Sequence, residues 1–167
     1  SPTRSRSCLA WAVAAAVAAA RDLGVGLVVP EDERVKHGDA VAGVGAAEEL
    51  SGQPDVCIVL GGDGSILYAL RRYADTGVPV FGINFGTIGF LAAVERELLA
   101  DGLRRAFSGD YVVMDLPALR ADLPVDLPVA LNDVSFIRRP HGRVAELSYT
   151  IGQEEVGNVR CDGLVAA

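Results

Sequence analysis

One short stretch, CIVLGGDGSIL at residues 57–67, constrains the fold of this chain more than any other part of the sequence. Residues 56–60 are apolar and rich in β-branched side chains, which predicts a short buried strand. The strand ends at a glycine-rich turn, residues 61–64, which carries one carboxylate, Asp63. A helical pattern follows from Ser65, which is placed to cap the helix. The stretch therefore predicts a strand, a glycine turn and a helix N-terminus in direct succession.

The turn has the composition of an anion-binding site. Glycines accept positive φ and let a ligand approach the backbone, and a helix N-terminus favours phosphate. Asp63 is unusual there, because a carboxylate repels phosphate unless it holds a metal or takes a proton from an attacking hydroxyl. The turn lacks the lysine of a P-loop and the spacing of the dinucleotide fingerprint. An ordinary turn with an exposed Asp stays open as the alternative, since Gly and Asp are common in turns.

Helical and strand-like patterns alternate through the first part of the chain. Helices are predicted up to Leu23, weakly over 40–50, from Ser65 to Ala74 and over 95–107. Strands are predicted at 26–30, 56–60 and 78–83, and a charged loop or surface segment over 31–39. This alternation with short connections predicts an α/β domain with a parallel sheet. Ligands of such sheets bind beyond the carboxyl ends of the strands, where the turn 61–64 falls.

A second glycine-rich loop, residues 84–90, follows the next strand along the chain. We expect it at the same edge of the sheet, opposite Asp63. In a ligand-facing loop, Phe85 or Phe90 could stack on a base. The alternative is a glycine-rich link with two phenylalanines in the core.

From Tyr111 onward the pattern changes to strands separated by Pro, Gly and Asp. The predicted strands are 111–115, 129–137, 144–151 and 156–160, and no helix is predicted among them. We therefore predict a boundary near Gly109. Residues 1–109 are predicted to form a parallel-sheet, Rossmann-like α/β domain, and residues 110–167 the start of a mostly antiparallel β domain.

Two pairs of polar residues stand out in the second part. Asn132 and Asp133 are adjacent within an apolar strand, so they line one pocket only if the strand ends or bulges there. Arg160 and Asp162 are two residues apart, so they share one face of a strand. A turn or a salt bridge is the alternative for each pair.

Composition limits the classes of partner. Half of the 167 residues are apolar (50%), so the chain can bury a core, and its formal net charge is −7. This charge argues against nucleic acid or an anionic membrane as the main partner. A nucleotide is compatible with it, because backbone amides bind phosphate in an acidic protein. The three cysteines are far apart and lack zinc spacing, which predicts reduced thiols in a cytoplasmic protein.

The N-terminal segment resembles a signal peptide, with Arg4 and Arg6 followed by an apolar stretch over 8–20. The stretch is shorter than the roughly 20 residues that a membrane span requires. Gly24 follows as a predicted C-terminal cap. We therefore favour a buried, alanine-rich helix and no membrane association.

Taken together, these stretches resemble NAD kinase, the family that transfers the γ-phosphate of ATP, or of polyphosphate in some members, to the 2′-hydroxyl of the adenosine ribose of NAD. GGDGS at residues 61–65 is similar to its GGDG motif, GINFGTIGFL at 82–91 to G-[IV]-N-x-G-x-x-G-F-L, and ALNDV at 130–134 to A-L-N-[ED]-V. Residues 160–164 resemble the approach to its Gly/Thr-rich signature. Lipid kinases and phosphofructokinases share the first motif, whereas the second and third are more specific.

The resemblance implies roles for particular residues. Asp63 would be the catalytic base for the 2′-hydroxyl. The implied cofactor-binding residues are Gly61, Gly62, Gly64, Phe85, Asn132, Asp133, Arg143, Arg160 and Asp162. No residue is expected to bind a metal directly, because Mg²⁺ or another divalent cation would arrive on the ATP phosphates. The implied partners are small-molecule nucleotides, with a homo-oligomer, dimer or tetramer, in the intact protein.

Two departures from the family pattern bear on activity. The T-P-T-G-S-T-A-Y signature is expected directly after Ala167, and the first strand of the α/β domain before Ser1. The chain is therefore expected to be a fragment of a NAD kinase that is inactive by itself. Two alternatives stay open. One is a related GGDG-type kinase for a lipid or sugar alcohol, against which the Asn132–Asp133 pair argues, and the other is a non-catalytic nucleotide-binding module.

Overall fold

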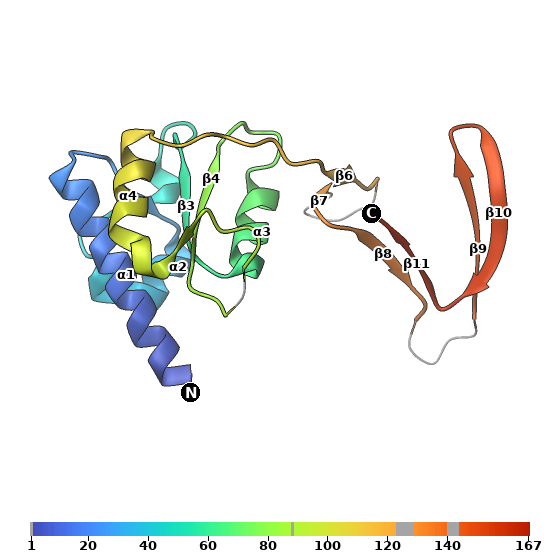
Figure 1. Cartoon of the computed structure of the whole chain (residues 1–167), viewed down its shortest axis with the longest axis horizontal. Coiled ribbons are helices and arrows are strands. Elements are labelled where there is room, and N and C mark those ends of the chain that lie inside the picture. Colours follow the sequence, from blue (N-terminus) through green and yellow to red (C-terminus); the bar gives the residue numbers. More distant parts are fainter. Residues whose placement is uncertain (1, 88, 123–128, 140–143) are drawn as a thin grey trace. The chain divides into compact units, whose positions relative to one another are not determined.

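The computed structural model of the chain describes residues 2–87, 89–122, 129–139 and 144–167 (Figure 1). These residues fall into two compact units, Ser1–Asp115 and Leu116–Ala167, and each is described by itself. The first unit combines helices with parallel strands, and the second contains only strands among its described residues. None of the helices in the described ranges is long and apolar enough to cross a membrane.

A parallel sheet forms the centre of the first unit. Its strands are β3 (Cys57–Gly61), β4 (Val80–Asn84) and β5 (Val94–Glu95), in the order β3-β4-β5. The predicted parallel α/β sheet is therefore confirmed. The register pairs Gly61 with Asn84 and Asn84 with Glu95, so the carboxyl ends of all three strands lie in one row.

Helices cover both faces of this sheet (Figure 1). One face carries α1 (Pro2–Asp22) and α4 (Leu99–Ser108), and α3 (Asp63–Arg72) lies on the other. The buried cluster beneath the first pair consists of Ala12, Ala16, Phe81, Ile83, Leu99, Leu103 and Ala106. Alanines on α1 permit a close approach of helix to sheet, because their side chains end at Cβ.

Two of the predicted helices agree with the structure to different degrees. The helix predicted up to Leu23 spans Pro2–Asp22. The predicted helix over 95–107 begins only at Leu99, because Glu95 pairs with β4 and a 3-10 turn, η3 (Arg96–Leu98), intervenes. Tertiary pairing with the neighbouring strand overrides the helical pattern there.

Residues 28–49 form a small peripheral layer. Here β1 (Val28–Val29) pairs in parallel with β2 (Gly45–Ala46). Between and after these strands lie α2 (Glu31–His37), η1 (Gly38–Val41) and η2 (Ala47–Glu49). The helix predicted over 40–50 is therefore wrong. Of the two alternatives for 31–39, the loop is wrong, because the segment is a helix at the surface with no buried residue.

The charges of α2 explain why it forms. Its acidic residues occupy the first turn and its basic residues the last, which complements the helix dipole. The Glu31 Oε2 lies 3.3 Å from the Arg34 Nε, and the Glu33 Oε2 lies 3.3 Å from the His37 Nε2. These residues are three and four positions apart, so their side chains are neighbours on the helix. The segment is charged because it is an exposed helix, not because it is a loop.

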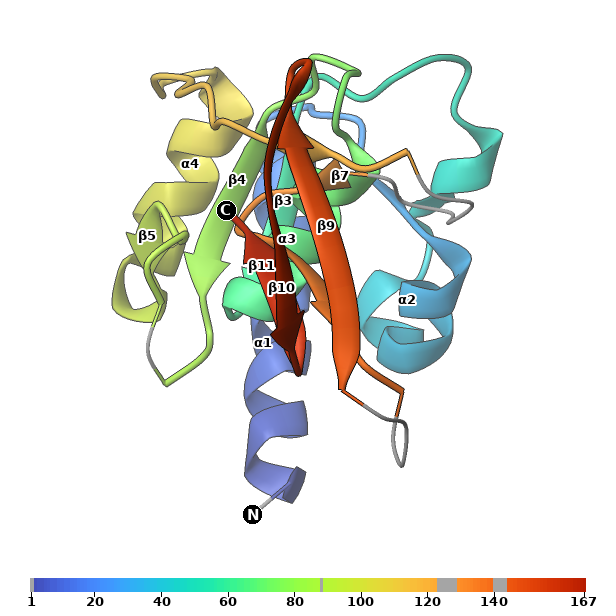
Figure 2. The same ribbon diagram turned by 90° about the vertical axis from the view of Figure 1, so that its right-hand side faces the viewer.

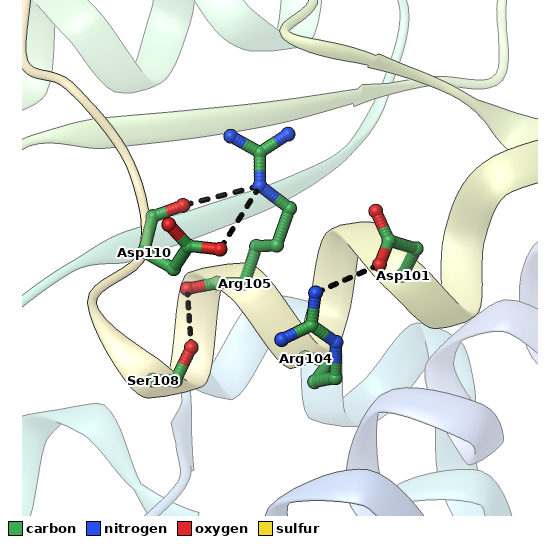
Figure 3. Close-up of polar contacts among 5 residues, drawn as sticks. All are labelled: Asp101, Arg104, Arg105, Ser108 and Asp110. Atoms are coloured by element: carbon green, nitrogen blue, oxygen red, sulfur yellow. Dashed lines mark hydrogen bonds and ion pairs between the residues drawn. The ribbon is translucent and has the colours of Figure 1, made fainter.

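The C-terminal end of α4 is fixed by short-range polar contacts, which Figure 3 shows. Gly109 adopts the left-handed conformation that ends many helices, with φ of 72°. The Arg105 Nε donates to the Asp110 carbonyl oxygen at 3.1 Å, and the Ser108 hydroxyl donates to the Arg105 carbonyl at 3.3 Å. Arg105 and Ser108 thus have a structural role at the end of the helix.

The chain after Gly109 still belongs to the first unit. Tyr111 packs edge-on against Phe81, with ring centroids 5.9 Å apart. The strand predicted over 111–115 does not form, and the first unit extends to Asp115. That the two units are the two domains that the sequence predicts, with the boundary near Gly109, stays a prediction.

The described residues of the second unit form three antiparallel pairs. They are β6 (Leu119–Arg120) with β7 (Val129–Ala130), β8 (Val134–Ile137) with β11 (Gly163–Ala166), and β9 (Ala145–Ile151) with β10 (Glu154–Cys161). The long strands β9 and β10 run side by side in Figure 2. The predicted antiparallel pairing is confirmed, but the single strand predicted over 129–137 is two strands in different sheets.

Candidate functional site

The site is built around the junction of β3 and α3. Gly61 is the last residue of β3, Gly62 is the N-cap, and Asp63 is the first residue of α3. The helix thus begins two residues earlier than predicted. Ser65 is not a cap, since its amide donates to the Gly62 carbonyl at 3.0 Å within the first turn. The consequence is that the Asp63 side chain starts at the positive end of the helix dipole.

The glycines of the turn allow close packing and do not adopt unusual backbone dihedral angles. Positive φ is absent at Gly61, Gly62 and Gly64. A Cβ on Gly61 would lie 2.8 Å from the Ser65 Cβ, and one on Gly62 would lie 3.5 Å from the Gly86 Cα. A Cβ on Gly64 would have no neighbour within 4 Å. Within the protein, therefore, Gly61 is required by packing and Gly64 is not.

This difference gives a matched pair of predictions. Gly61→Ala is expected to lower the free energy of unfolding by about 1–2 kcal/mol, because the added methyl overlaps Ser65. Gly64→Ala is expected to leave it unchanged or to raise it by up to about 1 kcal/mol, since Ala favours helix over Gly. Urea unfolding followed by the helical circular dichroism signal measures both. Equal destabilisation by the two substitutions would contradict this account of the turn.

Asp63 holds the second glycine-rich loop. Its Oδ2 accepts a hydrogen bond from the Phe90 amide at 3.0 Å, and its Oδ1 accepts one from the Leu91 amide at 3.3 Å. The Asp63 side chain is thus partly buried and engaged, unlike that of an ordinary exposed turn residue. Each carboxylate oxygen offers more than one lone pair, so Asp63 retains acceptor capacity for a substrate hydroxyl.

The base of the same loop is tied to the sheet. The Phe85 amide donates to the Gly61 carbonyl at 2.9 Å. Asn84, which is 6% exposed, accepts from the Gly86 amide at 2.9 Å and donates to Glu95 at 3.0 Å. The sequence analysis assigned no role to Asn84 or Glu95. One feature of the sequence could have indicated Asn84. It is a polar residue that ends an apolar, buried strand, and a buried polar side chain requires hydrogen-bond partners.

Gly89 fits between the two polar side chains of the site. A Cβ at this position would lie 3.1 Å from the Asp63 Oδ1 and 3.2 Å from the Asn84 Cγ. A side chain there would therefore push against both groups. The glycine in this part of the motif is explained by close packing on Asp63 and Asn84.

The two phenylalanines of the loop have different surroundings. Phe85 packs against the buried cluster of the first unit, as in the core alternative. Phe90 is 89% exposed, so its ring is accessible to a ligand. The backbone amide of Phe90 contacts Asp63, while the aromatic side chain of Phe90 is exposed.

The remaining predicted site residues lie in the second unit. Asn132 and Asp133 are exposed between the end of β7 and the start of β8, so the strand does end there. The Ser135 hydroxyl donates to Asp133 at 2.7 Å. Both Asn132 and Asp133 can thus belong to one site, which a continuous strand would prevent.

Arg160 and Asp162 do not pair with each other. Asp162 lies between β10 and β11 and forms an ion pair with Arg138. Arg160 is exposed in β10, opposite Glu146 of β9. Arg143, the remaining predicted contact, lies outside the described residues.

Cys57 is a second potentially reactive side chain of the first unit. Burial raises the pKa of the Cys57 thiol, so this cysteine is a poor nucleophile at neutral pH. The described residues contain no group of three His, Cys, Asp or Glu side chains that could hold a metal ion. A cavity of about 230 Å³ beside α2 is lined by Glu31 and Arg34, which pair with each other at 3.3 Å.

The sequence of this chain is similar to that of a known protein family. A family model described as the ATP-NAD kinase N-terminal domain matches residues 8–111. NAD kinases of Symbiobacterium thermophilum and Nitratidesulfovibrio vulgaris are 36% and 38% identical over 70% and 78% of this chain, and the matches cover 43% and 46% of their own lengths. This chain thus spans less than half the length of these curated relatives.

Two solved structures are similar in fold. The crystal structure of an NAD kinase from Archaeoglobus fulgidus in complex with ATP matches with a TM-score of 0.57 and 26% identity, over 83% of this chain and 58% of that chain. Yeast NADH kinase complexed with NADH matches with a TM-score of 0.66 and 17% identity, over 96% of this chain and 52% of that one, and it shows the fold alone.

The parallel sheet with its acidic glycine turn defines the α/β domain of a GGDG-type kinase. The family model covers more than half of the sequence, and the curated relatives agree with it. The chain belongs to the NAD kinase family.

Proposed function

We propose that this chain is part of a NAD kinase, which transfers the γ-phosphate of ATP, or of polyphosphate, to the 2′-hydroxyl of the adenosine ribose of NAD to give NADP. Family membership supports the reaction class. The observation that carries the proposal is the placement of Asp63, whose carboxylate lies at the start of α3 and is held by two loop amides. An acidic group fixed beside the helix N-terminus suits transfer of a phosphoryl group to a hydroxyl.

In this mechanism Asp63 accepts the proton of the 2′-hydroxyl. The hydroxyl oxygen forms a bond to the γ-phosphorus, the bond from that phosphorus to the bridging oxygen breaks, and ADP leaves with the electron pair. Because the transition state of phosphoryl transfer is loose, the proton moves late and positioning contributes most of the rate. The two loop amides support this role, because they fix the orientation of the carboxylate.

The binding residues extend the proposal. We place phosphate groups at the amides of Gly62 and Gly64, where the helix begins and no side chain intervenes at Gly64. In the second unit, Asn132 and Asp133 hold the adenosine moiety, and Arg160 and Asp162 contact the rest of NAD. Arg143 is a further NAD contact. In the first unit, Phe85, which is partly buried against the core, is proposed as a nucleotide contact.

The complete protein is further proposed to be a cytoplasmic homo-oligomer that requires a divalent cation. Mg²⁺ would bind chiefly to the donor phosphates, where it offsets their charge. Removal of the cation by a chelator is expected to abolish transfer.

A coupled assay tests the function. The chain is incubated with NAD, ATP and Mg²⁺, and NADP is detected with a NADP-specific dehydrogenase. The same assay is run on a chimera that joins this chain to the C-terminal part of a curated relative. NADP from the chimera supports the proposal, and NADP from the chain alone shows in addition that residues 1–167 suffice. Binding of NAD or ATP by the chimera without turnover would favour a binding module, and phosphorylation of a lipid or sugar but not NAD would favour a related kinase.

A further inference from the structure

The loop that carries the amides for Asp63 is closed at its base by two side chains from neighbouring strands. Asn84 ends β4 and Glu95 ends β5, and they are direct partners in the parallel register. We propose that Glu95 is a positioning residue, which acts through the buried amide of Asn84 to fix loop residues 85–87 and 89–91 against Asp63. Its effect on turnover rests on the proposed function, whereas its effect on the loop does not.

The chemistry of the contact fixes the orientation of the Asn84 amide. The Glu95 carboxylate can only accept and the Gly86 amide can only donate, so the Asn84 Nδ2 must face Glu95 and its Oδ1 must face Gly86. Asn84 is 6% exposed, whereas Glu95 and Gly86 are themselves exposed. Because the amide itself is buried, the loss of either partner would leave a buried polar group without a hydrogen bond. The Gly86 amide therefore donates to Asn84, and Asn84 in turn donates to Glu95.

A continuous set of contacts leads from Glu95 to Asp63. Asn84 holds the start of the loop through Gly86, whose Cα lies 3.5 Å from the place of a Cβ on Gly62. Gly89 lies against both Asn84 and Asp63. The next two amides, those of Phe90 and Leu91, donate to the Asp63 carboxylate. A shift of the Asn84 side chain thus displaces the donors that orient Asp63.

A reversal of hydrogen-bond polarity tests this inference. Asn84→Asp keeps an acceptor for the Gly86 amide but sets a carboxylate against Glu95. Glu95→Gln alone keeps an acceptor for the Asn84 Nδ2. In the double variant N84D/E95Q, the introduced amide donates to the introduced carboxylate, so the contact is restored with the opposite polarity. Glu95→Ala removes the acceptor without adding a charge.

The readout is hydrogen exchange of the Phe90 and Leu91 amides in the 167-residue chain. N84D is expected to accelerate their exchange about tenfold or more, and E95A about fivefold. E95Q and N84D/E95Q are expected to stay within about threefold of the unsubstituted chain. Glu97→Gln is the matched control, because Glu97 is exposed, pairs with its neighbour Arg96 and is expected to leave the exchange unchanged.

The amides of β3 serve as an internal reference, since a loss of the whole fold would accelerate them as well. Unchanged loop exchange in E95A, or failure of E95Q to restore protection to N84D, would overturn the inference. If N84D alone unfolds, recovery of both β3 and loop protection in the double variant still supports it.

The turnover assay separates positioning from structure. In the chimera, N84D is expected to lower kcat about tenfold while the KM for NAD stays within about threefold, and N84D/E95Q is expected to recover most of kcat. A matching loss of kcat in E95Q would overturn the hydrogen-bond role. If the unsubstituted chimera makes no NADP, the proposed function fails, and the exchange series still decides the inference.

Discussion

Asp63→Asn is expected to lower NAD phosphorylation by at least about 100-fold, which is the usual contribution of a positioned general base. The amide oxygen is a far weaker base than a carboxylate, so the 2′-hydroxyl keeps its proton longer. The substitution is nearly isosteric, so the first unit should keep its fold. The measurement is kcat of the chimera, with the helical circular dichroism signal as the check on folding.

The same substitution also weakens the hold on the loop. An Asn side chain offers one acceptor oxygen, whereas the Asp63 carboxylate uses both oxygens for the Phe90 and Leu91 amides. Comparison with Asn84→Asp separates the two effects, because that variant loosens the loop but keeps the base. Asp101→Asn is the matched control, since Asp101 is exposed on α4 and pairs with Arg104 at 2.9 Å. Near-normal turnover in Asp63→Asn would remove Asp63 from the base role.

Leu103→Ala is expected to lower the free energy of unfolding of the first unit by about 2–5 kcal/mol. Leu103 is 1% exposed and lies in the cluster between α4, α1 and the sheet. The truncation leaves a cavity that the neighbouring side chains fill only in part. Urea unfolding followed by the helical signal reports on this unit, because the described residues of the second unit form no helix.

Leu98→Ala provides the matched control. Leu98 precedes α4 and is 59% exposed, so its truncation is expected to cost no more than about 0.5 kcal/mol. Leu98 lies in the η3 turn, outside α4, and not in the buried cluster. Equal losses in the two variants would contradict the packing described for α4.

Local sequence was sufficient for several parts of the fold. The run 56–60 is apolar and β-branched, and the turn 61–64 is rich in glycine, so a strand and a helix in succession were predictable. The alternation of such patterns predicted the parallel sheet. Charge patterns were less informative, because the ion pairs that make α2 a helix occur equally in exposed loops.

The residues of the candidate site could be predicted from the sequence only in part. Asp63 could be singled out from its own turn, because a carboxylate is chemically unusual where phosphate binds. The predicted roles of Asn132, Asp133, Arg160 and Asp162 came from the resemblance to the family and stay predictions. Asn84 and Glu95 were overlooked, because neither has a distinctive neighbour within its own segment.

Sequence alone was enough for the strand, acidic glycine turn and helix of residues 57–72, and for the family to which the chain belongs. These features depend on residues that are close along the chain. Only the tertiary structure decided that Asp63 holds Phe90 and Leu91, and that Glu95 meets Asn84. The physical reason is register, because the pairing of three parallel strands sets which side chains meet at the edge of the sheet, and no local pattern encodes that pairing.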